Sequence, residues 1–240
     1  MIFAPVLRLT SFHQETSSGT GVLIMISTTA EMTRARYEIR RHKHLARRHE
    51  HTDRLFRIED GWACQYRLLP DGRRQIIALF LPGDYCEAQW VLTGQANWPI
   101  VALTDMFVTE IPFHDIRARH AAHNSQEPDG MKSLLGSIMH TLKSHEKWIV
   151  NLGRMSATER ICALLHDLVE RLRPSGKVVS NHCPMPLTQY DLADIVGISS
   201  VHVNRVLQML RGEGVISLEA GRLALLNPVE LRRLGGPAHV

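Results

Sequence analysis

The apolar residues between positions 186 and 226 change their spacing along the chain, and each spacing predicts a different element. Helical spacing predicts a short helix at 189–196 and a second helix at 200–210, separated by a turn centred on Gly197. Two short apolar runs, 215–218 and 223–226, then flank a turn at 219–221 and predict a β-hairpin. The order of helix, turn, helix and hairpin is that of a winged helix-turn-helix.

The second of these predicted helices separates its apolar residues from its polar ones. The apolar stripe, with i, i+3, i+4 and i+7 spacing, consists of Val203, Val206, Leu207 and Leu210. The opposite side offers Val201, His202, Asn204, Arg205 and Gln208. Arginine can bond guanine, Asn or Gln can bond adenine, and an apolar side chain can touch a thymine methyl group. The pattern therefore indicates a DNA recognition helix, with an ordinary solvated helical hairpin as the alternative.

The start of the first helix adds to this predicted surface. Thr188 is a good N-cap, and the free backbone N–H groups behind it are suited to holding a phosphate. The residues expected to lie at the DNA are Thr188, Gln189, Ser199, Ser200, Val201, His202, Asn204, Arg205 and Gln208.

The N-terminal half of the chain alternates short β-favouring runs with turns. The predicted strands lie at 54–59, 62–69, 75–81 and 100–111. Glycine and proline separate them, at Gly61, Pro70-Asp71-Gly72 and Pro82-Gly83-Asp84. Several short strands at this spacing indicate a β-roll of the jelly-roll kind.

A long helix is predicted between the two halves, at 131–152. Its apolar seam alternates spacings of four and three and consists of Met131, Leu135, Ile138, Leu142, His145, Ile149 and Leu152. Such a seam predicts a parallel coiled coil with a second copy of the chain, and packing on the chain's own β-roll is the alternative. Gly153 is expected to end this helix. A capping box at Ser156 to Glu159 then predicts the start of another helix, with a buried stripe at Ile161, Leu164, Leu165, Leu168 and Leu172.

These elements predict an α+β chain of four parts: a poorly ordered segment at 1–30, a β-roll at 31–127, a dimerisation helix at 128–153 and a winged helix-turn-helix at 154–240. The 240 residues are 44% hydrophobic, which is enough to bury a sizeable core. A net charge of +4 permits nucleic-acid binding. Four scattered cysteines without a C-x-x-C pair, and no apolar run of membrane-spanning length, favour a soluble, cytoplasmic protein.

The residues from about Arg54 to Leu234 resemble the Crp/Fnr family of bacterial transcription regulators. The stretch that resembles the family's effector-sensing β-roll reads GWACQYRLLPDGRRQIIALFLPGD. The resemblance implies a homodimer that binds a palindromic site in double-stranded DNA and contacts RNA polymerase. Arg205 matches the family's recognition Arg, but Val201 stands where the best-known members carry a Glu that reads cytosine. The half-site sequence is therefore expected to differ.

The resemblance also allows the family's effectors to be tested against this sequence. Cyclic-nucleotide binders carry a Gly-Glu pair after the Pro-Gly-Asp turn and an Arg-Ser on a later turn. This chain has Tyr85-Cys86-Glu87 and Asn97-Trp98-Pro99 there, so the phosphate-binding Arg is missing. No cysteine precedes Cys64, which excludes the family's N-terminal iron–sulfur ligands. No cofactor is predicted, and an unidentified small-molecule effector would lie near Tyr85, Cys86, Glu87 and Trp98.

Three alternatives stay open from the sequence. Cys64 and Cys86 form either a redox pair or two small buried side chains. The run RRHKHLARRHEH at 40–51 is either a solvated, pH-responsive or anion-binding surface or a metal or haem ligand set. The chain has no nucleophile motif and is not expected to be an enzyme. It is expected to be a DNA-binding regulator that responds to a ligand, or one with a vestigial pocket that is controlled by its abundance. The remaining alternative is a ligand- or metal-binding β-roll protein whose helix-turn-helix serves protein contacts.

Overall fold

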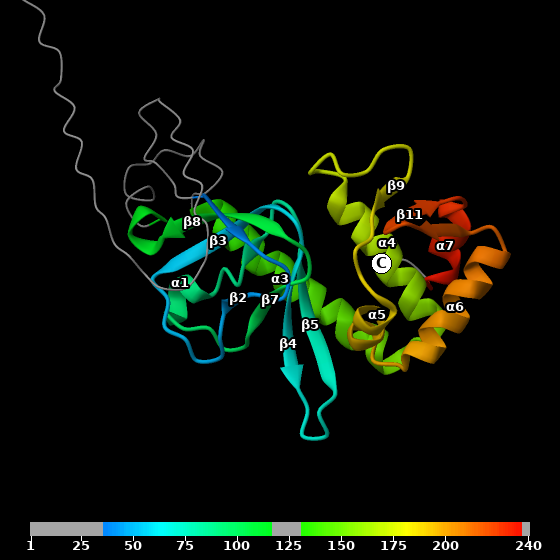
Figure 1. Ribbon diagram of the computed structural model, residues 1–240, viewed down its shortest axis with the longest axis horizontal. Coiled ribbons are helices and arrows are strands. Elements are labelled where there is room, and N and C mark those ends of the chain that lie inside the picture. The colour runs from blue at the N-terminus through cyan, green and yellow to red at the C-terminus, as the bar shows by residue number, and fades with distance from the viewer. Residues whose placement is uncertain (1–35, 117–130, 237–240) are drawn as a thin grey trace, which may run out of the picture.

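The computed structural model describes residues 36–116 and 131–236. Figure 1 shows two lobes, one of β-sheet and one mainly helical, joined by the long helix α3 (Met131–Arg154). The expected segment at 1–30, the expected boundary at 127–128 and the side chain of Met131 lie outside the described residues. No helix in the described ranges is long and apolar enough to cross a membrane.

The β-sheet lobe consists of two four-stranded antiparallel sheets. One has the order β1 (Arg36–Ile39), β8 (Met106–Pro112), β3 (Arg54–Asp60) and β6 (Tyr85–Cys86). The other has the order β2 (His44–Ala46), β7 (Ile100–Ala102), β4 (Ala63–Leu68) and β5 (Arg74–Phe80). A short helix, α1 (Trp90–Thr93), contributes the fully buried Trp90 to the core between them. The predicted β-roll is confirmed.

One predicted strand is wrong in its extent. The run 100–111 was expected to be continuous, but the chain leaves the second sheet after β7 and enters the first sheet at β8. The backbone N–H groups of Leu103 and Thr104 bond to the carbonyl oxygen of Trp62 at this crossing. Gly61 makes the crossing feasible: its φ is +88°, and a Cβ there would lie 2.4 Å from the Cβ of Met106.

The helix α3 ends two residues beyond its expected end at Leu152. Gly153 does not terminate it, because the helix continues to Arg154 and the N–H of Met155 still bonds to the carbonyl oxygen of Asn151. Ser156 then caps α4 (Ala157–Leu172) through a reciprocal capping box with Glu159, as predicted. The predicted stripe of α4 is buried, together with Cys162 and Val169.

The C-terminal lobe is a winged helix. The helices α5 (Gln189–Val196) and α6 (Ser200–Gly212) are followed by the wing strands β10 (Ile216–Glu219) and β11 (Arg222–Leu225). Two elements were not predicted: β9 (His182–Pro184), which extends the wing to three strands in the order β10-β11-β9, and α7 (Pro228–Leu234), which packs on α4.

Besides the core between the two sheets, a second hydrophobic core spans both lobes. Buried residues of the β-roll, including Ile76 and Leu79 on β5, belong to the same cluster as Leu165 on α4 and Ile195 on α5. This shared core holds the helix-turn-helix against the β4–β5 hairpin. In Figure 1, α5 lies beside β5.

Candidate nucleic-acid interface

The turn between α5 and α6 is built by three local features of the sequence. The side chain of Thr188 accepts a hydrogen bond from the N–H of Asp191, and the Asp191 carboxylate bonds back to the N–H of Thr188. Gly197 ends α5 in the left-handed conformation, with φ of +69°. Ser199 then caps α6 by accepting from the N–H of His202. These caps hold the two helices in a helix-turn-helix.

The helix α6 presents the predicted face to solvent. Val203, Val206, Leu207 and Leu210 are buried. The side chains that are exposed on the opposite side are Val201, His202, Asn204, Arg205 and Gln208. Val201 is 70% exposed and so lies on the same solvent-facing side as the polar residues of the helix. Figure 1 places α6 at the outer edge of the helical lobe.

A hydrogen bond links the two helices on this exposed surface. The side-chain amide N of Gln189, at the start of α5, donates to Oδ1 of Asn204 at 3.2 Å. The Asn204 side-chain N forms no hydrogen bond with any described residue, so it remains available as a donor. Both residues were predicted to lie at the DNA. Their contact shows that the start of α5 and the exposed side of α6 form one continuous surface.

Arg205 is exposed and makes no hydrogen bond or ion pair with any described residue. Several other arginines of the described residues form ion pairs, as Arg74, Arg171 and Arg233 do. An unpaired guanidinium has all its donors available for a planar bidentate acceptor such as a guanine edge.

The predicted dimer seam of α3 has two environments. Its exposed apolar members are Leu135, Leu142, Ile149 and Leu152, and Met139 and Val150 extend the same surface. Ile138 instead packs partly against the β-roll core. His145 lines a cavity of about 40 Å³ between α3 and β5. One apolar face of α3 is therefore not covered by any described residue of the single chain, and it follows the line of the predicted seam.

The four residues expected to form an effector pocket have different surroundings. Tyr85, Cys86 and Glu87 are buried. Burial raises the pKa of the Glu87 carboxyl above its ordinary value, although a hydrogen bond from the Gln89 amide acts in the opposite direction. Trp98 lies instead between the guanidinium groups of Arg48 and Arg67, at 4.7 and 4.2 Å from the ring centroid. Trp98 therefore belongs to a basic surface and does not line the cavity between α3 and β5.

The two thiols considered as a redox pair are buried. Cys64 and Cys86 are free, and burial raises the pKa of Cys64 to about 12 and that of Cys86 well above its usual value. Thiols of this kind remain protonated and unreactive at neutral pH. They also lie on strands of different sheets, β4 and β6, so the description as small buried side chains fits them best.

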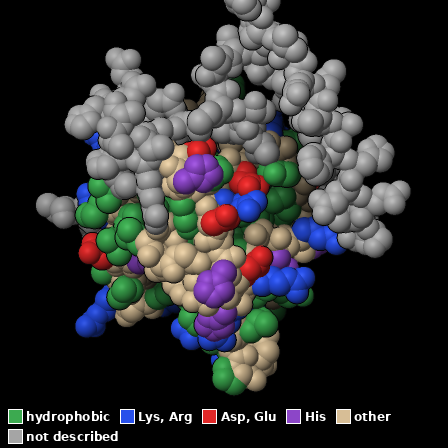
Figure 2. Space-filling model, turned by 90° about the vertical axis from the view of Figure 1, so that its left-hand side faces the viewer, with side chains coloured by type: hydrophobic (Ala, Val, Ile, Leu, Met, Phe, Trp, Pro, Cys, Tyr) green, Lys and Arg blue, Asp and Glu red, His purple; other side chains and the backbone are tan. Residues whose placement is uncertain are grey.

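The histidine-rich run at 40–51 lies at the surface of the β-roll. Figure 2 shows that end of the molecule, where histidine side chains are interspersed with basic and acidic ones. No group of three or more His, Cys, Asp or Glu side chains in the described ranges is placed to share a metal ion. The alternative of a metal or haem ligand set in this run therefore gains no support.

A contact that the sequence did not reveal connects the β-roll to the helix-turn-helix. Arg74 on β5 donates hydrogen bonds to Asp191 at 2.6 Å and Asp194 at 2.7 Å, both on α5. The Gln75 amide donates to the carbonyl oxygen of Ile195 at 3.1 Å. The partners are more than one hundred residues apart in the chain, and no local pattern marks them.

Comparisons with known proteins agree with this architecture. Residues 159–234 match the Crp-like helix-turn-helix domain, and residues 36–123 match the cyclic nucleotide-binding domain. The nitrogen fixation regulation protein FixK of Bradyrhizobium diazoefficiens is 30% identical over 183 residues, covering 76% of this chain and 74% of that protein. FixK of Rhizobium meliloti is 28% identical over 183 residues, covering 76% of this chain and 78% of that protein.

A solved structure has the same fold. The structure of FixK2 from Bradyrhizobium japonicum superposes with a TM-score of 0.73 at 24% identity, covering 87% of this chain and all of that one. Both domains of the family are matched in the expected order, and a relative is 30% identical over most of both chains. This chain belongs to the Crp/Fnr family of transcription regulators.

Proposed function

We propose that this protein regulates transcription as a homodimer that binds a palindromic site in double-stranded DNA through α6. The observation that carries the proposal is the exposed face of α6, where Arg205 has no partner among the described residues and Val201, Asn204 and Gln208 are exposed as well. Family membership supports it, because the relatives are named as regulators of nitrogen fixation and as transcriptional activators. No catalytic role is proposed.

The side chains of α6 support a specific division of labour on the DNA. Arg205 would bond the O6 and N7 atoms of a guanine, and the side-chain amide N of Asn204 would donate to a base or phosphate acceptor. Val201 has no hydrogen-bonding group, so it would contact a thymine methyl group in place of a cytosine amine. The residues at or near the N-termini of α5 and α6 would lie near phosphates; they are Thr188, Gln189, Ser199, Ser200 and His202.

The exposed face of α3 supports the homodimer. Leu135, Leu142 and Ile149 recur every seven residues, and a matching face on a second copy would bury them. A twofold dimer places its two recognition helices about 34 Å apart, one turn of DNA, which requires a palindromic site. Contact with RNA polymerase in the cytoplasm would complete the regulatory role.

The input signal has two candidates. A small-molecule effector near Tyr85 and Glu87 would follow the family's general plan, and the small cavity beside α3 is the nearest described space. The tight packing of the Tyr85–Glu87 segment favours the second candidate, a regulator with a vestigial pocket whose activity follows its abundance. Both candidates are compatible with DNA binding through α6.

The test is selection of bound sequences from a random DNA pool with the full-length protein. We expect an enriched palindrome, and we expect Arg205→Ala to weaken binding and to make one base position per half-site degenerate. Arg211→Ala is the matched control, because Arg211 is also exposed on α6 but lies in its last turn. It should keep the same motif.

Two results would refute the proposal. One is salt-sensitive binding without any enriched sequence, which would leave only non-specific phosphate contacts. The other is an enriched motif that Arg205→Ala leaves unaltered, because α6 would then not read the bases.

A further inference from the structure

The helix α5 is too short to keep its position without help from the rest of the chain. It has 8 residues (Gln189–Val196), and an isolated helix of that length is marginal in water. Its apolar side chains pack in the core that spans both lobes, but the polar backbone groups at its two ends also need partners. Strand β5 of the β-roll contacts the helix at both ends.

At the first turn of α5, β5 supplies a cation. The Arg74 guanidinium donates to Oδ1 of Asp191 at 2.6 Å and to Asp194 at 2.7 Å. Oδ2 of Asp191 accepts from the backbone N–H of Thr188 at 2.9 Å and from its hydroxyl group at 2.7 Å. The two oxygens of one carboxylate are thus divided between the β-roll and the helix cap. Arg74 thereby holds the carboxylate in the orientation that closes the capping box.

At the last turn of α5, β5 supplies a hydrogen-bond donor. The final carbonyl groups of a helix have no partner within the helix. The side-chain amide of Gln75, the residue after Arg74, donates to the carbonyl oxygen of Ile195 at 3.1 Å. Arg160 on α4 donates to the carbonyl oxygen of Val196 at 3.2 Å. Two adjacent residues of β5 therefore hold α5 at both of its ends.

The position of α5 determines part of the proposed DNA surface. Thr188 and Gln189, at the end that Arg74 holds, are expected to lie near phosphates, and phosphate contacts fix the register of a protein on the duplex. The Gln189 amide also donates to Oδ1 of Asn204 on α6 at 3.2 Å. A shift of α5 would therefore displace the phosphate contacts and the Asn204 side chain together.

We propose that Arg74 is a positioning residue for DNA binding, which acts through Asp191 and sets the place of α5 on the DNA. The inference rests on the proposed function and adds a residue of the β-roll to it. Arg74→Ala should weaken binding about tenfold and leave the selected sequence unchanged, because the side chains that would contact the bases are all retained. Arg74→Lys should restore only part of the loss, since an ammonium group lacks the planar fork that bonds two carboxylates.

Two measurements on the full-length protein test the role of Arg74. Amide hydrogen exchange needs no DNA: the N–H of Asp191, which bonds Oγ1 of Thr188, should exchange about tenfold faster in Arg74→Ala. The N–H of Val203, which bonds the carbonyl oxygen of Ser199 within α6, should keep its wild-type rate. The second measurement is affinity for the palindrome that the wild type selects, at a temperature where every variant is folded.

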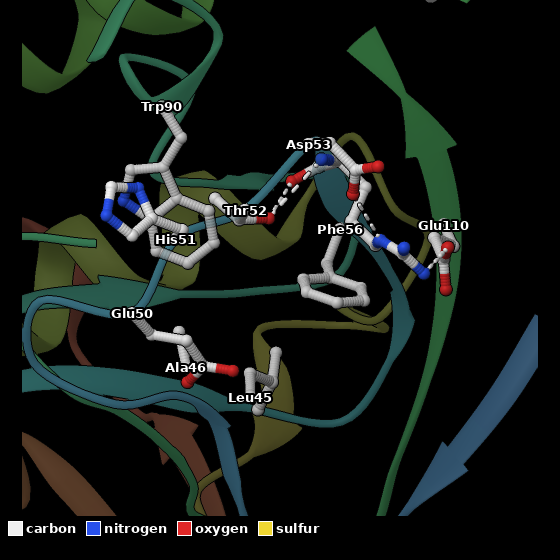
Figure 3. A pocket seen from close by; sticks show the side chains of 10 residues that line it. Leu45, Ala46, Glu50, His51, Thr52, Asp53, Phe56, Trp90 and Glu110 are labelled. Atoms are coloured by element: carbon white, nitrogen blue, oxygen red, sulfur yellow. Dashed lines mark hydrogen bonds and ion pairs between the residues drawn. The ribbon is translucent and has the colours of Figure 1, made fainter. Parts of the chain in front are cut away.

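Arg54→Ala is the control for the chemistry of the contact. Arg54 also joins two carboxylates, those of Asp53 and Glu110, but both belong to the β-roll. They lie at a cavity of about 300 Å³ beside Trp90 (Figure 3), and none of the residues that line this cavity belongs to β5 or to the helix-turn-helix. Arg54→Ala should leave both the DNA affinity and the exchange at Asp191 unchanged.

Arg171→Ala separates the positioning of α5 from a general loosening of the two lobes. Arg171 on α4 also crosses to the β-roll, with Nη2 at 2.7 Å from Asp84 and 2.7 Å from the carbonyl oxygen of Leu79, and within the described ranges it bonds no residue of α5. This variant should lose stability as Arg74→Ala does, but its DNA affinity should stay within about twofold of wild type.

The outcomes distinguish this inference from the proposed function. If the wild type selects no palindrome, the proposed function fails, and exchange at Asp191 still decides whether Arg74 positions α5. If the wild type selects one, two results overturn the inference: an affinity that Arg74→Ala leaves intact, or an equal loss of affinity in Arg171→Ala. Wild-type exchange at Asp191 in Arg74→Ala overturns it in either case.

Discussion

The Arg74 guanidinium on β5 donates a 2.6 Å hydrogen bond to the Asp191 carboxylate on α5. That carboxylate is also the capping partner of Thr188, which it bonds through both the backbone N–H and the hydroxyl group. A single carboxylate therefore connects the β-roll to the first turn of the helix-turn-helix. Arg74 bonds Asp194 as well, so its side chain holds two points on α5.

The first prediction concerns this interdomain contact. Arg74→Ala should lower the free energy of unfolding by about 1–3 kcal/mol, because it leaves two partly buried carboxylates without their cation. Urea denaturation of the purified protein measures the change. Arg73→Ala is the matched control: Arg73 is the adjacent residue, pairs with Asp71 in the exposed turn, and should alter stability by less than about 0.5 kcal/mol. Equal effects of the two variants would contradict the role given to Arg74.

The second prediction is the acid sensitivity of the same contact. Burial opposes ionisation of Asp191, but hydrogen bonds from Thr188 and Arg74 outweigh it and hold the pKa below the ordinary value of 3.8. A carboxyl whose folded pKa is depressed stabilises the fold above its unfolded pKa, and the contribution is lost as the pH falls through the folded pKa. Asp191→Asn should therefore be less stable than wild type at pH 7.

The stability gap between Asp191→Asn and wild type should narrow below about pH 4, in the range where the wild-type carboxyl takes up its proton. Thermal denaturation between pH 3 and pH 7 gives the profile. A gap that stays constant over this range would mean that the loss comes from the changed helix cap alone and not from the charge of Asp191.

The third prediction has the opposite pH dependence. Burial raises the pKa of Glu87 on folding, so its charged form destabilises the native state at neutral pH. The stability associated with this group is present below its ordinary pKa of 4.5 and is lost as the pH rises through the folded value. Glu87→Gln should accordingly raise the melting temperature at pH 7 and lose this advantage near pH 4. A variant less stable than wild type at pH 7 would show that the carboxylate is needed for structure.

The fourth prediction concerns the sequence that α6 reads. Val201→Glu should shift the selected DNA motif toward a C·G pair at one position of each half-site, because a carboxylate accepts a hydrogen bond from the cytosine amine. Selection from a random pool measures the shift. Val229→Glu is the matched control, since Val229 is 75% exposed on α7, comparable with the 70% of Val201. An unchanged motif in Val201→Glu would place this residue away from the bases.

The sequence predicted the helix-turn-helix well because its signals are local. Caps at Thr188 and Ser156, the turn at Gly197 and the apolar stripe of α6 depend only on residues within one or two helical turns. The exposed positions of α6 followed from the same spacing.

The β-roll and its contacts were less predictable because they depend on distant residues. The crossing after β7 depends on Gly61 and Trp62, some forty positions away. The contact of Arg74 with α5 and the cavity at Trp90 have no local pattern at all. The heptad of α3 showed where the apolar residues are, but it did not distinguish Ile138 and His145, which face the chain's own β-roll, from the uncovered Ile149.

The last prediction tests that uncovered face. Ile149 is 72% exposed in the single chain, and a twofold dimer would bury it twice. Burial of an isoleucine side chain is worth about 1.5–3 kcal/mol, so Ile149→Asp should weaken the dimer by about 3 kcal/mol or more, a hundredfold or greater rise in its dissociation constant. Sedimentation at several protein concentrations measures this. Leu92→Asp is the matched control, because Leu92 is 78% exposed on α1 and lies outside α3. Dimers of equal strength in the two variants would show that α3 does not form the interface.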